Sequence, residues 1–315
     1  MESILQWGLD LIRSVQNFSS PPLTAFMKIA TWFGAAPSYL VLLSLIFWCI
    51  DEKKGARLGV AVMVSLWLNI ILKFLLNQPR PFWEGYDPSV GLVAEKLNGF
   101  PSGHAQISLV LWIIIASFGK KKRYYAAAVL FVLLISFSRV YLGVHFPTDI
   151  AGGWLLGGIV LAVYFIWGDA LEALLVRGGL RTQLIASAAA AFIMILCNPQ
   201  SAREVQGGIE VQLMPGGLLL GMGAGYSLTA HYLRFRAAGL SGRGSKLPVL
   251  LARFILGMAG VALIFVVFRK INGILGADYI RMGIFFRFAL MELWIYAGAV
   301  RVFQFFKLAE REQRV

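Results

Sequence analysis

Long apolar runs, separated by short polar and basic segments, dominate this chain of 315 residues. About nine of these runs are candidate membrane spans, each near or somewhat below the roughly 20 residues that cross the hydrocarbon core of a bilayer. They fall at about 29–50, 57–76, 104–118, 124–141, 149–167, 183–197, 213–232, 248–268 and 283–306. The pattern predicts an all-α fold, namely a polytopic transmembrane helical bundle.

The N-terminal residues depart from this pattern because charged side chains interrupt the apolar ones. Asp10 and Arg13 lie among apolar residues such as Trp7 and Leu11. This arrangement is typical of an amphipathic helix that lies at the membrane interface instead of crossing it. We therefore expect an interfacial helix before the first span.

The charge pattern gives the predicted bundle an orientation. The formal net charge is +13 at pH 7, although only 14% of the residues are charged and 58% are hydrophobic. With about nine spans, five basic segments fall on one side, which the positive-inside rule makes cytoplasmic. These segments are residues 53–57, 120–123, 177–181, 234–246 and 307–314. We attribute the positive charge to topology and contact with membrane lipids, and we expect no nucleic acid partner.

Three polar clusters lie at span ends and, on this topology, meet at the external mouth of the bundle. Lys73 ends the second span and Arg80 follows it, His104 begins the third, Arg139 ends the fourth and Asp149 begins the fifth. Cations beside hydrocarbon are costly unless they bind an anion or one another. Arginine forks and a lysine ammonium together suit the oxygens of a phosphoryl group. As an alternative, the Lys73 side chain could simply extend to the membrane interface. This alternative accounts for Lys73 but not for the histidines.

The second cluster is Pro101-Ser102-Gly103-His104, directly before an apolar run. Ser102 is expected to cap the helix, so that the first backbone N–H groups point at an anion. His104 would stand beside that anion, where an imidazolium can hand a proton to a leaving oxygen. An isolated histidine of this kind is more often structural.

The third cluster contains Ser138, Arg139, His145 and Asp149. Pro147 is expected in the first turn of the fifth span, which places His145 just outside the helix and Asp149 one turn later. The carboxylate can then hold one ring nitrogen and leave the other free to attack. The alternative is that Asp149 caps the helix beside an incidental histidine.

In order, the clusters read Lys73-x6-Arg80-Pro81, Pro101-Ser102-Gly103-His104 and Ser138-Arg139-x5-His145-x3-Asp149. They resemble the three-part signature of the type 2 phosphatidic acid phosphatases, and every signature residue matches. The resemblance covers about residues 25–167. Together with the apolar pattern, it divides the chain into three expected parts: an interfacial helix (1–26), a phosphatase core of about five spans (27–168) and an additional transmembrane region of about four spans (169–315).

The family resemblance also implies a mechanism without a cofactor or metal ion. His145 would form a phosphohistidine, Asp149 would orient it, and His104 would protonate the leaving group. The phosphoryl oxygens would be held by Lys73, Arg80, Ser102, Gly103 and Arg139. The acidic residues Glu84, Asp87 and Glu95 of the loop from 77 to 100 are expected to form a solvated lid or substrate-selecting segment.

The motifs recognise a phosphoryl group and say little about what carries it. A site at membrane level favours a lipid phosphate or diphosphate, such as phosphatidate, phosphatidylglycerophosphate or a polyprenyl diphosphate carrier, over a soluble sugar phosphate. We expect an integral protein of the plasma (inner) membrane with its site on the external, periplasmic side. The vanadium haloperoxidases share the signature, so a vanadate-dependent haloperoxidase is the alternative enzyme.

The C-terminal region carries no catalytic motif. It is expected to serve packing or dimerisation in a homo-oligomer, and a lipid-handling or transport role is the alternative. Close helix packing is predicted by small residues, at Gly216, Gly217, Gly221, Gly223 and Gly225. Glu292 lies in an apolar run, where an unpaired carboxylate costs roughly a few kcal/mol, so we expect Arg287, Arg253 or a polar cavity beside it.

Overall fold

The computed structural model describes residues 2–83, 85–197, 208–237, 246–274 and 277–310. All regular elements within these ranges are helices, which confirms the predicted all-α fold. The chain divides into two compact units. The first contains Met1–Tyr39 and Val64–Ile166, and the second contains Leu40–Met63, Trp167–Asn198 and Gly208–Val315. The candidate catalytic residues all belong to the first unit.

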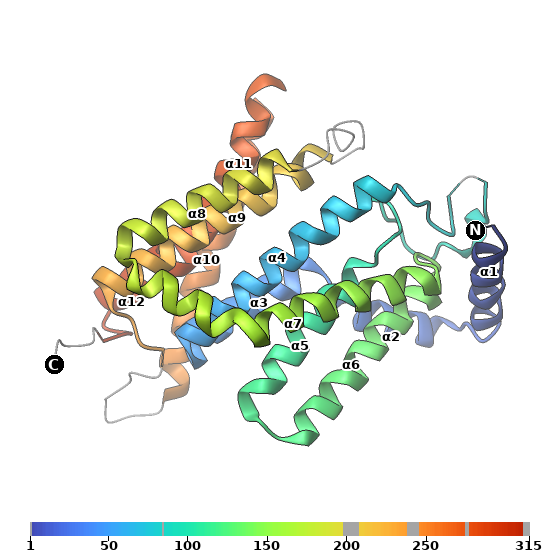
Figure 1. Cartoon of the computed structure of the whole chain (residues 1–315), viewed down its shortest axis with the longest axis horizontal. Coiled ribbons are helices and arrows are strands. Elements are labelled where there is room, and N and C mark those ends of the chain that lie inside the picture. Colours follow the sequence, from blue (N-terminus) through green and yellow to red (C-terminus); the bar gives the residue numbers. More distant parts are fainter. Residues whose placement is uncertain (1, 84, 198–207, 238–245, 275–276, 311–315) are drawn as a thin grey trace. The chain divides into compact units, whose positions relative to one another are not determined.

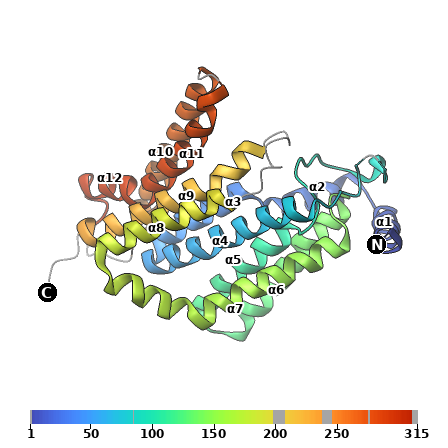
Figure 2. The same ribbon diagram turned by 45° about the horizontal axis from the view of Figure 1, so that its top comes forward.

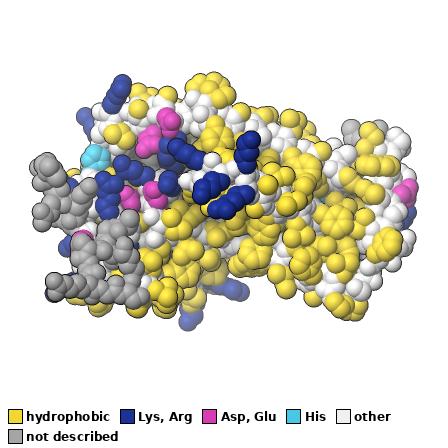
Figure 3. Space-filling view, turned by 90° about the horizontal axis from the view of Figure 1, so that it is seen from below, with side chains coloured by type: hydrophobic (Ala, Val, Ile, Leu, Met, Phe, Trp, Pro, Cys, Tyr) yellow, Lys and Arg dark blue, Asp and Glu magenta, His cyan; other side chains and the backbone are white. Residues whose placement is uncertain are grey.

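Among the described residues, six helices are long and apolar enough to cross a membrane, or seven if one broken pair counts as a span. The six are Glu52–Leu76 (α4), Lys122–Tyr141 (α6), Pro147–Arg177 (α7), Gly179–Leu196 (α8), Leu247–Ile274 in α10 and Tyr279–Phe305. Hydrophobic side chains cover much of the face shown in Figure 3. Leu155 on α7, for example, is 70% exposed. The chain is therefore an integral membrane protein.

Two further apolar helices occupy predicted runs. Gly103–Gly119 (α5) is shorter than a typical span, and Gly208–Leu228 (α9) precedes a π-helical turn at Thr229–Leu233. The region after 277 consists of Ala277–Leu293 (α11), a π-helical turn at Trp294–Gly298 and Ala299–Phe305 (α12). Each of the predicted apolar runs thus lies largely within helices.

The first unit packs short N-terminal helices against α5, α6 and α7. Helices α5 and α6 lie side by side and are joined by a short connection (Figures 1 and 2). Helix α2 (Pro21–Trp32) packs on α6. Helix α1 (Glu2–Gln16) buries Leu9 and Ile12 in a cluster with Phe146 and Ile150. The N-terminal segment is therefore a helix with an apolar side packed on the unit.

The predicted span at 29–50 is instead a broken pair of helices. Helix α2 ends at Trp32, and α3 (Ala36–Leu45) is followed by a π-helical turn at Ile46–Ile50. Pro37 lies in the first turn of α3 and has no N–H group to continue a hydrogen-bond ladder from α2. Gly34 lies in the break, where an added Cβ would come 2.9 Å from Cδ2 of His104. The break therefore brings the backbone close to a candidate catalytic residue.

In the second unit, α9 packs between α8 and α11, and α8 and α9 lie side by side in Figures 1 and 2. A Cβ added to Gly217 would come 2.6 Å from the Phe285 carbonyl oxygen of α11, and one added to Gly221 would overlap the Ala289 carbonyl. Gly216 and Gly223 make comparable approaches to Ile195 and Ser187 of α8. The predicted role of these glycines in close packing is confirmed.

Arg253, one of the three surroundings expected for Glu292, binds other groups instead. The Arg253 guanidinium donates to three backbone carbonyls, those of Leu308, Trp48 and Ala237. Carbonyl groups at helix ends lack intrahelical partners, so they satisfy this cation in place of a carboxylate. Glu292 itself is buried, with 3% of its surface exposed.

Candidate active site

The eight predicted site residues lie at helix ends and in the two loops that join those helices. Lys73 is in the last turn of α4, and Arg80 follows in the loop. Ser102 caps α5, whose first turn holds Gly103 and His104, and Arg139 is in the last turn of α6. His145 directly precedes α7, whose first turn contains Asp149. Polar contacts link most of these residues into one buried cluster.

His145 and Asp149 form the hydrogen bond that the sequence predicts. Nδ1 of His145 lies 3.0 Å from Oδ2 of Asp149, and the same oxygen accepts the Phe146 N–H at 3.0 Å. On its other side, Nε2 of His145 lies 3.3 Å from Nη1 of Arg80. Because a guanidinium can only donate, Nε2 is the acceptor and Nδ1 carries the proton toward Asp149. Burial, Arg80 and Lys73 hold the pKa of His145 well below its ordinary value, so the ring is neutral.

Lys73 and Arg80 tie down the end of the long loop. The Lys73 ammonium donates to the carbonyl oxygens of Asn98 at 2.6 Å and Gly99 at 2.9 Å. Arg80 donates from Nε to the Leu97 carbonyl at 2.5 Å and from Nη1 to Val144 at 2.7 Å. Burial lowers the pKa of Arg80 to about 10, which leaves it charged at neutral pH.

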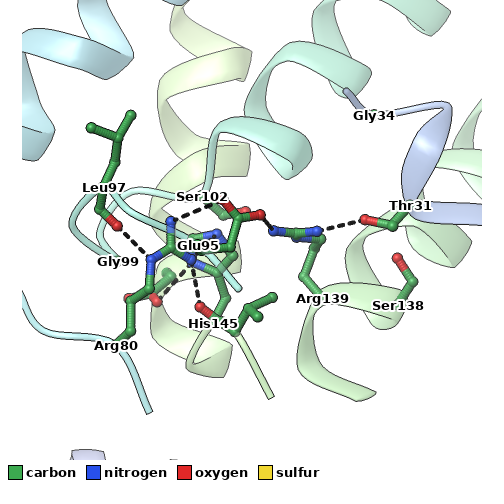
Figure 4. Close-up of polar contacts among 12 residues, drawn as sticks. Thr31, Gly34, Arg80, Glu95, Leu97, Gly99, Ser102, Ser138, Arg139 and His145 are labelled. Atoms are coloured by element: carbon green, nitrogen blue, oxygen red, sulfur yellow. Dashed lines mark hydrogen bonds and ion pairs between the residues drawn. The ribbon is translucent and has the colours of Figure 1, made fainter. Parts of the chain in front are cut away.

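Glu95 joins the cations, which corrects the expectation that it belongs to a solvated lid. Its carboxylate forms an ion pair with Arg139 and lies 3.9 Å from Nη2 of Arg80. Figure 4 shows Glu95 between the two guanidinium groups. Burial alone would raise the pKa of Glu95, but Arg139 and Arg80 outweigh it and lower that pKa. Its only sequence signal was a carboxylate in a loop between two basic clusters.

Asp87, a second acidic residue of this loop, makes its contacts away from the cluster. Asp87 pairs with Arg13 of α1 at 2.7 Å and caps a short 3-10 turn at Pro88–Val90. Glu84 lies outside the described residues. Tyr86 of this loop also packs on the unit, since its ring lies on that of Phe146 with centroids 5.7 Å apart. The loop is therefore held by internal contacts at several points.

Thr31 is a second residue that sequence reasoning missed. Its Oγ1 accepts a hydrogen bond from Nη1 of Arg139 at 2.7 Å (Figure 4). Arg139 is 2% exposed, and its Nε has no hydrogen-bond partner among the described residues. Thr31 and Glu95 thus hold the guanidinium from two sides, and the Nε–H group is left without a partner among the described residues.

The Pro101–His104 segment is held by hydrogen bonds to the Asn69 side chain and to the backbone of Asp149. Asn69 donates to the Pro101 carbonyl at 3.1 Å, and the Ser102 N–H donates to the Asp149 carbonyl at 2.9 Å. The Ser102 hydroxyl accepts the Ala105 N–H at 3.4 Å, which confirms the predicted cap. The first free N–H groups of α5 are therefore those of Gly103 and His104. Among the described residues, no hydrogen bond engages the His104 ring.

The chemistry of this donor set is that of anion binding. Lys73, Arg80 and Arg139 supply three cations near a neutral histidine, whose Nε2 lies 3.3 Å from Nη1 of Arg80. In the described part of the chain, no three His, Cys, Asp or Glu side chains gather in a way that could hold a metal ion. The cluster can bind an oxyanion, place an imidazole nitrogen beside it and offer a second imidazole nearby.

Comparisons with known proteins agree with this chemistry. A family model described as the PAP2 superfamily matches residues 54–172, and one described as PAP2 superfamily phosphatase, transmembrane extension, matches residues 213–311. An undecaprenyl-diphosphatase of Sulfolobus acidocaldarius is 26% identical over 163 residues, which are 50% of this chain and 76% of that protein. Phosphatidylglycerophosphatase B of Bacillus subtilis is 32% identical over 159 residues, 46% of this chain and 74% of that protein. The match to the crystal structure of Aquifex aeolicus LpxE covers 50% of this chain and 93% of that chain, at 30% identity and with a TM-score of 0.46.

Proposed function

Since the chain belongs to the PAP2 superfamily and is a phosphatase, we propose that it releases phosphate from a membrane lipid phosphate or diphosphate. The observation that carries this proposal is the contact of His145 with both Asp149 and Arg80. One ring nitrogen is held by a carboxylate while the other faces a cation that suits a phosphoryl oxygen. The relatives named for undecaprenyl diphosphate and phosphatidylglycerophosphate support an amphiphilic substrate.

In the first step, Nε2 of His145 attacks phosphorus, a P–N bond forms and the bond to the leaving oxygen breaks. His104 gives its proton to that oxygen. Asp149 accepts the Nδ1–H hydrogen bond and stabilises the positive charge that develops on the ring. In the second step His104 takes a proton from water, whose oxygen attacks the phosphohistidine and releases inorganic phosphate and neutral His145.

The phosphoryl oxygens are held by Lys73, Arg80 and Arg139, together with the N-terminus of α5 at Ser102 and Gly103. Phosphoryl transfer needs positioning and charge neutralisation above all, and three buried cations supply both. We infer that the reaction is independent of metal ions. Since the Ser102 N–H is already bonded to Asp149, its contribution is the helix cap and its hydroxyl proton.

The membrane arrangement is part of the proposal. We propose about nine spans, in which α5, α9 and the broken N-terminal pair join the longer helices, with α1 at the interface. The basic loops then lie in the cytoplasm and the site faces the external, periplasmic side of the plasma membrane. Residues 27–168 form the phosphatase core, and residues 169–315 form a packing or dimerisation region.

One assay tests the proposed function. The purified protein is given phosphatidate, phosphatidylglycerophosphate, a polyprenyl diphosphate and glucose 6-phosphate, with and without EDTA, and released phosphate is measured. We expect release from at least one lipid, unchanged by EDTA and abolished by His145→Ala. Phosphate release from the sugar phosphate alone would overturn the proposal of a lipid substrate. Vanadate-dependent halide oxidation without phosphate release would favour the haloperoxidase alternative.

A further inference from the structure

The Glu95 carboxylate occupies the position that an anionic substrate needs. It contacts Arg139 directly and lies 3.9 Å from Arg80, whose other terminal nitrogen is 3.3 Å from Nε2 of His145. The charge of Lys73 also favours the ionised form of the Glu95 carboxylate. A carboxylate and a phosphoryl group both present paired oxygens to a guanidinium fork. The cations proposed to bind substrate are therefore already neutralised in part by the protein itself (Figure 4).

The segment that carries Glu95 is held at both ends, and between them Val93 packs on a buried cluster with Tyr141 and Leu142, while Glu95 pairs with Arg139. At one end the Leu92 N–H donates to the Leu142 carbonyl at 3.0 Å. At the other, the Leu97 carbonyl accepts from Arg80 at 2.5 Å. Between these anchors Ala94 and Lys96 are exposed, and the Glu95 side chain itself is 28% exposed. Apart from the ion pair of Glu95, residues 94–96 therefore have few anchoring contacts, and the Glu95 side chain can move outward while Lys73 and Arg80 keep the rest of the loop in place.

We propose that Glu95 is an internal competitor, which holds Arg80 and Arg139 until a phosphoryl group displaces it and thereby keeps weakly bound lipid headgroups out of the site. This inference rests on the proposed function. An internal competitor raises the apparent dissociation constant of every anion by the same factor. Phosphodiester headgroups, which are abundant in any bilayer, carry a single negative charge. With the competitor present, the affinity of the site for them is then too low for them to occupy it. A phosphomonoester carries about −1.5 to −2 charges at pH 7 and still binds.

Two alternatives make different predictions about Glu95. If its carboxylate only positions Arg80 and Arg139, its removal loosens both cations and anions bind more weakly. If it acts through net charge alone, removal of any nearby carboxylate tightens anion binding. Asp87 provides the matched control for this second case, because it lies in the same loop and pairs with Arg13 at 2.7 Å, away from the cluster.

The test measures binding of inorganic phosphate and of short-chain dihexanoyl phosphatidylglycerol, by calorimetry on the detergent-solubilised full chain. For Glu95→Gln we expect both dissociation constants to fall by the same factor, about tenfold or more. Glu95→Asp, whose shorter side chain reaches the guanidinium groups less well, should fall between Glu95→Gln and the wild type. Asp87→Asn should change neither constant.

Unchanged or weaker phosphate binding in a folded Glu95→Gln protein would overturn the proposal, and so would equal tightening in Asp87→Asn. Tightening for one ligand and not the other would also overturn it. Phosphate release from lipids by the wild type is measured beside these experiments. If the wild type hydrolyses lipid phosphates and only the binding shifts are missing, the Glu95 proposal fails alone; if it neither binds phosphate nor hydrolyses any substrate, the proposed function fails.

Discussion

Oδ2 of Asp149 accepts two hydrogen bonds at once, from Nδ1 of His145 and from the backbone N–H of Phe146, each at 3.0 Å. The second bond fixes the carboxylate on the first turn of α7, so the carboxylate in turn fixes the ring. Arg80 then meets the opposite ring nitrogen. The first turn of α7, through Asp149, and the guanidinium of Arg80 thus set the tautomer and the ring orientation of His145.

Asp149→Asn should lower kcat for lipid phosphate hydrolysis by about 10³- to 10⁴-fold, as removal of the equivalent carboxylate does in other His-Asp pairs. The amide can present its NH2 group to Nδ1, which favours the wrong tautomer for attack by Nε2. Asp169→Asn is the control, because Asp169 is on the same helix and its side chain is 88% exposed. Phosphate release measures both variants, and a loss smaller than tenfold for Asp149→Asn would argue that the carboxylate only caps α7.

Thr31→Val should weaken substrate binding, because it removes the oxygen that accepts the Arg139 Nη1 hydrogen bond at 2.7 Å. Losing a hydrogen bond to a charged group costs roughly 1.5–3 kcal/mol, which corresponds to about a tenfold or greater rise in KM. Thr31→Ser keeps the hydroxyl and should restore most of the affinity. Steady-state kinetics on one lipid phosphate separates KM from kcat, and equal effects of valine and serine would count against this role.

Gly34→Ala should impair His104, since the added Cβ would lie 2.9 Å from Cδ2 of its ring and 2.7 Å from Cγ2 of Ile135. A displaced acid slows hydrolysis of a lipid alkyl phosphate, with a poor leaving group, more than that of p-nitrophenyl phosphate. We expect the ratio of the two rates to fall by about tenfold or more. Gly158→Ala is the control because a Cβ there meets no atom within 4 Å. A parallel drop for both substrates would indicate general damage instead.

The pH profile should show a nucleophile with a lowered pKa. Attack requires neutral His145, and burial, Arg80 and Lys73 lower its pKa, so kcat/KM should persist below pH 6.5 and decline only as the ring gains a proton. Arg80→Gln removes one of these cations and should move the acidic limb to higher pH, besides lowering activity. Both proteins are assayed with the same substrate, so protonation of the substrate affects the two pH profiles equally. Coincident limbs would contradict this assignment.

The local parts of the site could be predicted from the sequence. His145 and Asp149 are four residues apart at a helix start, and Ser102 directly precedes an apolar run, so their contacts follow from helix geometry. Thr31 and Glu95 could not be found this way. They meet Arg139 from 108 and 44 residues away, and such contacts leave no periodic signal in one sequence.

The errors concerned polar groups with a choice of partners. Glu95 looked like a solvated loop carboxylate, yet two buried guanidinium groups attract it. Arg253 is one of three surroundings expected for Glu292, yet its guanidinium donates to backbone carbonyls. By contrast, the close packing of Gly217 and Gly221 was predictable, because small residues spaced four apart on one helix leave room for a neighbouring backbone.

The most direct test of the central claim is to trap the covalent intermediate. The protein is mixed with a lipid phosphate labelled with ³²P, quenched within milliseconds and digested, and the labelled residue is identified. We predict an acid-labile, base-stable phosphohistidine at His145, absent from His145→Ala and formed more slowly in His104→Ala. Label on another residue, or full hydrolytic activity in His145→Ala, would contradict the account.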